Sequence, residues 1–147
     1  FINLPILKVL GNDALGHAIS DDLVHWEYLP VALAPSEVYD NHLKGGCFSG
    51  SAVAYNDKLF IAYTGTTNNG NGFEQTQCIA YSEDGIHFEK YAGNPVITAP
   101  EGVSPDQFRD PKYGNMMEHS IWCVEQAEII AHRHCCINLQ ICLTGNL

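Results

Sequence analysis

Short runs rich in Val, Ile, Tyr, Phe and Thr, broken by Gly, Asn, Asp and Pro about every ten residues, fill the middle of the chain. Such runs are typical of short β-strands. Residues 48–55 and 58–64 predict a hairpin whose turn, Asn56-Asp57, tolerates positive φ. Residues 65–72 predict a polar loop, and residues 76–81 predict the next strand. The sequence therefore predicts an all-β fold.

An internal repeat narrows the choice among all-β folds. The segment 20–28 (SDDLVHWEY) returns as 82–90 (SEDGIHFEK), 62 residues later. In each copy a Ser-acid-Asp turn leads into an aromatic residue, Trp26 or Phe88, which we expect to pack between neighbouring sheets. Repeats of about 40 to 50 residues per four-stranded sheet are typical of β-propellers, and longer loops extend that spacing. The repeat thus favours a β-propeller.

Charge and hydropathy exclude several kinds of partner. Seventeen acidic against seven basic residues give a net charge of -10, which repels nucleic acid and anionic membranes. No apolar run approaches the roughly 20 residues that cross a bilayer, and no export signal is visible. We therefore expect a globular chain that binds neither nucleic acid nor membrane and is cytoplasmic. Secretion is the alternative, because the chain begins with Phe1 rather than Met.

Three motifs carry chemistry, and their order and separation matter more than any one alone. They are residues 16–26 (GHAISDDLVHW), 47–52 (CFSGSA) and 108–112 (FRDPK). Over about residues 16–112 the chain resembles glycoside hydrolase family 32, the invertases, levanases and sucrose-6-phosphate hydrolases. The resemblance implies a five-bladed β-propeller with a retaining mechanism that uses a carboxylate nucleophile and a carboxylic general acid. This chain would supply part of it, roughly blades one to three, with irregular ends.

The resemblance also assigns roles to four residues. Asp110 matches the family's third acidic residue, which stabilises the transition state by accepting hydrogen bonds from two adjacent sugar hydroxyls. Arg109 beside it supplies positive charge and donors toward the substrate. Phe48 and Ser49 match the substrate-contacting pair on an inner strand. The implied ligand is a β-fructoside such as sucrose, sucrose 6-phosphate or a fructan, without cofactor or metal.

Two catalytic groups of that family have no counterpart here. The nucleophile belongs to an Asn-Asp-Pro triplet, which occurs nowhere in the chain: Asn12-Asp13 is followed by Ala14. The general acid belongs to a Glu-Cys pair some 50 residues beyond the Arg-Asp-Pro motif, past Leu147. We therefore expect this chain alone to be inactive. A non-catalytic carbohydrate-binding propeller module, using the same four residues without hydrolysis, is the alternative function.

Both ends lose the family pattern abruptly, and we predict that residues 1–15 and 113–147 are out-of-frame segments flanking the family 32 portion, 16–112. The genetic code supports this prediction. If the third base of each codon is read with the first two of the next, Met116-Met117 forces Asp and Trp122-Cys123 forces Val. The shifted frame over residues 134–147 also permits a third copy of the repeat.

A cluster of cysteine and histidine near the C-terminus has a second interpretation, as a zinc or soft-metal site. Its spacing argues against metal, because Cys135 and Cys136 are adjacent instead of separated by two to four residues. Random out-of-frame sequence explains the excess of cysteine. The cluster comprises His132, His134, Cys135 and Cys136, with Cys123 and Cys142 nearby. The isolated histidines 17, 25, 42 and 87 are expected at ordinary strand or turn positions.

Overall fold

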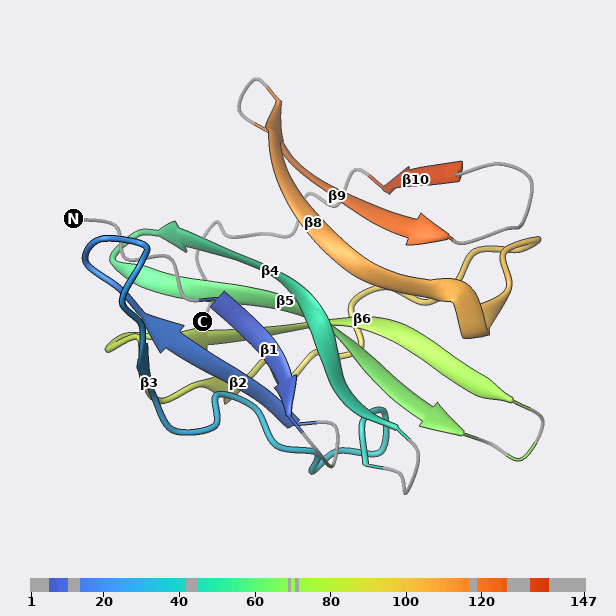
Figure 1. The fold of residues 1–147 in the computed structure, drawn as a ribbon. Coiled ribbons are helices and arrows are strands. Elements are labelled where there is room, and N and C mark those ends of the chain that lie inside the picture. Colours follow the sequence, from blue (N-terminus) through green and yellow to red (C-terminus); the bar gives the residue numbers. More distant parts are fainter. Residues whose placement is uncertain are drawn as a thin grey trace.

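The protein is described here from a computed structural model, which covers residues 6–10, 14–41, 45–68, 70, 72–116, 119–126 and 133–137. These residues form ten strands and a short 3-10 turn (Figure 1). The elements are β1 (Ile6–Leu10), β2 (Ala14–Ile19), β3 (Glu27–Tyr28), β4 (Gly46–Tyr55), β5 (Lys58–Asn68), β6 (Phe73–Ser82), β7 (Glu89–Lys90), η1 (Pro105–Gln107), β8 (Phe108–Met116), β9 (His119–Gln126) and β10 (Arg133–Ile137).

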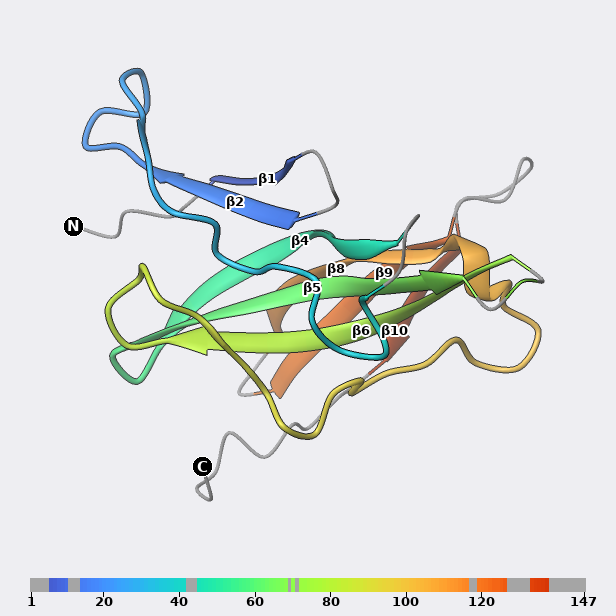
Figure 2. The same cartoon turned by 90° about the horizontal axis from the view of Figure 1, so that it is seen from below.

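Three antiparallel sheets follow one another along the chain. The first sheet is β1-β2-β3, the middle sheet is β4-β5-β6-β7, and the third sheet is β8-β9-β10. Figure 2 shows the first and third sheets on either side of the middle one. Strand β4 contacts β1 and β2 on one side, and β8 crosses β4 and β5 on the other. This succession of antiparallel sheets packed face to face confirms the predicted partial β-propeller.

The predicted hairpin forms the centre of the middle sheet. Strands β4 and β5 pair in antiparallel register from Gly46↔Thr66 to Tyr55↔Lys58. Asn56 and Asp57 both have positive φ, 49° and 59°, as the two-residue turn between twisted strands requires. The register places alternate residues of β5 on opposite faces.

The predicted loop at residues 65–72 is wrong in its first half, because β5 continues to Asn68 and β6 begins already at Phe73. Gly65 is therefore a strand residue. A Cβ at this position would lie 2.9 Å from the main-chain oxygen of Tyr39. Glycine here allows the linker between the first and middle sheets to cross close to β5. A glycine in a strand often marks such a close approach of another backbone, not only a turn.

Both copies of the sequence repeat adopt the same turn. The Ser20 hydroxyl accepts a hydrogen bond from the main-chain N–H of Leu23 (2.8 Å), and Ser82 does the same for Gly85 (2.8 Å). In each turn the Asp carboxylate accepts from two main-chain N–H groups and from the His Nδ1 three residues on. These bonds hold the pKa of Asp22 and of Asp84 well below the usual value.

The second turn also joins two sheets. His17 on β2 is 2 % exposed, and its Nε2–H donates to the main-chain oxygen of Gly85 (3.1 Å). The ring of Phe88 meets His17 edge-on at 5.5 Å between centroids. The expected packing of Phe88 between sheets is thus confirmed. Trp26, at the matching position of the first copy, is also half-buried.

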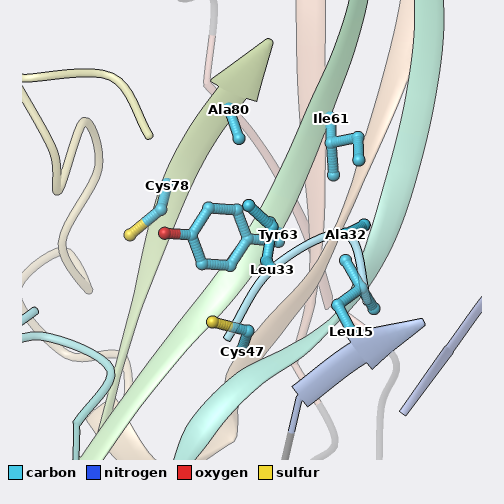
Figure 3. Packing of buried hydrophobic residues seen from close by; sticks show 8 residues of the cluster. All are labelled: Leu15, Ala32, Leu33, Cys47, Ile61, Tyr63, Cys78 and Ala80. Atoms are coloured by element: carbon cyan, nitrogen blue, oxygen red, sulfur yellow. The ribbon is translucent and has the colours of Figure 1, made fainter. Parts of the chain in front are cut away.

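The main core lies between the first and middle sheets (Figure 3). Tyr63 of β5 lies there with the thiols of Cys47 and Cys78. Burial raises the pKa of both thiols to about 12, with Asp40 a further cause. The cluster comprises Leu15, Ala32, Leu33, Cys47, Ile61, Tyr63, Cys78 and Ala80.

A smaller core on the opposite face of β5 joins the middle and third sheets. Ala62, Ile97 and Phe108 are all buried there. Because β5 is covered on both faces, it contains a continuous run of seven buried residues rather than an alternating pattern. This second core fixes the start of β8, where the candidate site lies.

An ion pair fastens the linker between the first and middle sheets. Asp40 is fully buried, and Lys90 of β7 donates to it at 2.6 Å. Lys90 also donates to the main-chain oxygen of Ala34 (2.9 Å), and the Tyr63 hydroxyl donates to Asp40 (3.2 Å). Strand β7 thereby holds the linker that precedes β4, the strand at the opposite edge of the same sheet.

The ends of the chain differ from expectation where they are described. We predicted irregular ends, yet β1 pairs with β2, and β9 pairs with β8 and β10. Main-chain N–H and C=O groups form these ladders whatever the side chains, so strand pairing does not require the family sequence. Residues 1–5, 11–13, 117–118, 127–132 and 138–147 of these ends lie outside the described part.

Candidate functional site

Asp110 occupies an irregularity at the beginning of β8. Its φ is 58°, a left-handed conformation that Asp tolerates better than most residues but that still costs about 1–3 kcal/mol. The register with β9 breaks between Arg109 and Lys112. Pro111 has no N–H to give to a ladder, which is one reason that the pairing is interrupted here. The side chain of Asp110 is 39 % exposed.

A second irregularity in β4 faces the first. The β4–β5 register shifts between Phe48 and Gly50, so Ser49 has no partner in the ladder. Gly50 fits because a Cβ there would collide with the main-chain oxygen of Ala62. The Ser49 hydroxyl donates to Oδ1 of Asp110 at 2.8 Å. Two bulges in separate sheets thus meet at one carboxylate, and bulges commonly re-aim side chains at functional sites.

Arg109 is the nearest cation to this carboxylate among the described residues. Its Nε lies 3.7 Å from Oδ2 of Asp110, with the two side chains 38 % and 39 % exposed. An ion pair of this length and exposure contributes little to stability. Both groups therefore remain available to a ligand. A carboxylate has about four acceptor positions, and Ser49 uses one.

The main chain around Asp110 is held from behind by two polar residues that sequence reasoning missed. Gln77 Nε2 donates to the main-chain oxygen of Phe108 (2.7 Å). Thr64 donates to Gln77 Oε1 (3.0 Å) and accepts from the main-chain N–H of Asp110 (3.1 Å). In the sequence, the only indication of Thr64 and Gln77 was that polar residues occupy inward positions of otherwise apolar strands.

The predicted site residues are therefore partly assembled. Ser49 and Arg109 lie beside Asp110, and Phe48 is half-buried next to Ser49 on β4. A cavity of about 610 Å³ lies elsewhere, between the linker at Tyr39 and the segment at Tyr91. It contains none of the four predicted residues. Asp110 instead is partly exposed.

The structure also bears on metal and membrane association. Within the described residues no group of three His, Cys, Asp or Glu side chains could hold a metal ion. Cys135 and Cys136 lie on β10, whereas His132 and Cys142 of the same cluster, and the isolated His42, fall outside the described part. No described helix is long and apolar enough to span a bilayer.

The fold consists of packed antiparallel blades, and a carboxylate lies where two strand irregularities meet. Together with the motif resemblance, these features define the class of protein as β-propeller glycoside hydrolases. Comparison with known proteins identifies the family. The sequence model of the glycosyl hydrolases family 32 N-terminal domain matches residues 1–134. The chain belongs to glycoside hydrolase family 32.

Relatives and solved structures agree with this assignment. The chain is 48% identical to sucrose-6-phosphate hydrolase of Escherichia coli over 113 residues, 74% of this chain and 22% of that protein. It is 46% identical to raffinose invertase of Escherichia coli over 117 residues, 76% of this chain and 23% of that protein. A GH32 beta-fructofuranosidase of Bombyx mori superposes with a TM-score of 0.71 at 36% identity, covering 86% of this chain and 26% of that one. The chain thus spans about a quarter or less of these relatives.

Proposed function

We propose that this chain is part of an enzyme that hydrolyses terminal β-fructosyl bonds, and that Asp110 stabilises the transition state of that reaction. The observation that carries the proposal is the Ser49–Asp110 hydrogen bond of 2.8 Å between two facing bulges, with Arg109 beside it. It leaves one carboxylate, one hydroxyl and one guanidinium side by side, all three partly exposed. Similar proteins are named sucrose-6-phosphate hydrolase and raffinose invertase.

The proposed role follows from the charge that develops at the reacting carbon. Cleavage of the glycosidic bond passes through an oxocarbenium-like state, in which the ring hydroxyls become more acidic and bind an acceptor more tightly. The remaining acceptor positions of Asp110 would take two adjacent fructosyl hydroxyls. Arg109 would orient the same sugar by donating to it. Ser49 would keep Oδ1 from rotating away.

The chain alone would not complete the reaction. Retaining hydrolysis needs a nucleophile and a general acid, and the Asn-Asp-Pro triplet that carries the nucleophile in this family is absent from the sequence. We therefore propose that residues 1–147 bind a fructosyl unit without turning it over. Sucrose, sucrose 6-phosphate and fructans are the proposed substrate class of the complete enzyme, and a cytoplasmic location is proposed with them.

A chimera tests the enzyme proposal directly. Residues 16–112 would replace the matching segment of the Escherichia coli sucrose-6-phosphate hydrolase, the rest of which we expect to supply the nucleophile and the general acid. We expect hydrolysis of sucrose 6-phosphate by the chimera, and a loss on the order of 100- to 1000-fold in kcat on Asp110→Asn. The control is Asp106→Asn, on an exposed carboxylate of η1. A folded chimera in which both variants keep full turnover would refute the role of Asp110.

The absence of the triplet favours one alternative, a carbohydrate-binding module without catalysis. Its outcome differs from that of the enzyme. An inactive but folded chimera, together with saturable fructose binding by residues 1–147, would favour the module.

A further inference from the structure

We propose that Thr64 and Gln77 are positioning residues for Asp110. They hold the main chain on both sides of Arg109, so that Asp110 keeps its left-handed conformation and its carboxylate stays beside Ser49. The inference deepens the proposed function of Asp110 and rests on it. Neither residue contacts the face on which a sugar would lie, so neither is a catalytic residue.

The hydrogen bonds form a relay with one consistent direction. Phe108 contributes a main-chain carbonyl, which can only accept, so the Gln77 amide must turn Nε2 toward it (2.7 Å) and Oε1 away. Oε1 then accepts the hydroxyl proton of Thr64 (3.0 Å). With its proton committed, the Thr64 oxygen accepts the N–H of Asp110 (3.1 Å). Each bond thereby determines the orientation of the next.

Burial makes this relay stiff. Thr64 is 0% exposed and Gln77 is 1% exposed, so water cannot readily replace a lost partner. The relay also acts where the ladder with β9 is broken, between Arg109 and Lys112. The bond from Asp110 N–H to Thr64 falls within this break, and the bond from Gln77 holds Phe108 just before it. Without the Thr64 hydroxyl, we expect the bulge to relax to negative φ and the carboxylate to leave Ser49.

A neighbouring pair of the same residue types separates positioning from ordinary core packing. Thr66 and Gln75 face each other two residues along the same two strands, and they are 0% and 2% exposed. Unlike the relay, the Thr66 hydroxyl and Gln75 Oε1 make no hydrogen bond. Thr66→Val and Gln75→Asn therefore impose comparable changes in the same strands without touching the main chain of Asp110.

The test uses residues 1–147 and two measurements by NMR. The first is the strong intraresidue NOE between the amide proton and Hα of Asp110 that marks positive φ. The second is the affinity for fructose. We expect Thr64→Val and Gln77→Asn to abolish the NOE and to weaken fructose binding about tenfold, the effect of one buried hydrogen bond. Thr64→Ser, which restores the hydroxyl, and both controls should retain the wild-type values.

The outcomes are distinguishable. If the relay variants keep the NOE and the affinity, or change them no more than the controls do, the positioning role is wrong. If both relay variants fail to fold while both controls fold, the pair is structural and the inference is overturned. If the NOE behaves as expected but wild type itself binds no fructose, the positioning of Asp110 stands and the proposed function fails.

Discussion

Leu23 and Gly85 occupy equivalent positions in the two repeated turns and show how one backbone conformation recruits different residues. Their φ values are 62° and 74°. Glycine adopts this region without penalty, whereas a leucine side chain collides with the main chain. The first turn is therefore strained where the second is not. The hydrogen bonds that Ser20 and Asp22 accept within the first turn offset this backbone strain.

This difference predicts that Leu23→Gly stabilises the protein. Leu23 is 74% exposed, so little apolar burial is lost. Relief of about 1–2 kcal/mol of strain exceeds the added chain entropy of glycine, about 0.5–1 kcal/mol, and the net gain should be roughly 0.5–1 kcal/mol. The midpoint of thermal unfolding would measure it. The reverse change, Gly85→Leu, should lower the midpoint, and a fall in both variants would contradict the strain.

At the scale of elements, the linker that crosses from the first sheet to β4 depends on the buried Asp40–Lys90 pair. We expect Lys90→Met to lower the free energy of unfolding by about 3–5 kcal/mol, because it leaves a buried carboxylate without its cation. Urea unfolding would measure the change. Lys58→Met is the control: its pair with Glu83 spans 3.1 Å, but Lys58 is only half-buried and Glu83 is exposed, and its loss should cost less than about 1 kcal/mol. If both variants lowered the free energy of unfolding equally, burial of the Asp40–Lys90 pair would not explain its contribution to stability.

The contact between β2 and the second turn predicts an acid-sensitive step. Burial lowers the pKa of His17 below 6.5, and its Nδ1 has no partner. The unfolded chain therefore binds a proton that the folded chain resists, so stability is fully present above pH 6.5 and is lost as the pH falls below it. The contribution of Asp22 and Asp84 to stability is lost only below their usual pKa of 3.8. Urea midpoints between pH 7 and 5 should fall in wild type and remain level in His17→Gln.

Sequence reasoning predicted the elements better than the contacts between them. Alternation and the Asn56-Asp57 pair indicated the central hairpin, because both signals are local. Gly65 was misread, since close approach by Tyr39 depends on a segment 26 residues earlier. The approach of Ser49 to Asp110 was anticipated only through family motifs. Thr64 and Gln77 were missed because a buried polar residue does not reveal which distant main chain it will bind.

At the scale of the whole molecule, the family 32 portion and the ends of the chain pose different questions. The family model extends over residues 1–134, beyond the portion with clear motifs, 16–112. Strands β1, β9 and β10 show that the ends still pair. We nevertheless propose that residues 1–15 and 113–147 are read out of frame, on the strength of the residues that the codons of Met116-Met117 and Trp122-Cys123 force.

The nucleotide sequence decides this proposal. Across codons 10–18 and 110–118, we expect bases whose shifted frames encode Trp-Gly-Met-Met-His-Trp before residue 16 and Val-Trp-Lys-His-Asp-Gly after residue 112. Sequencing of the template on both strands would be the measurement. Bases that cannot encode these segments would show that the ends are genuine.

Cys47 and Cys78 lie in the seam between the first and middle sheets, and their burial gives them a use unrelated to catalysis. A thiol whose pKa is about 12 carries almost no thiolate at neutral pH, so a reagent can modify it only while the seam stands open. The rate of modification at these two positions, resolved by peptide mass mapping, would therefore count the separations of one blade from the next. The two buried thiols would thus report how often the first and middle sheets separate.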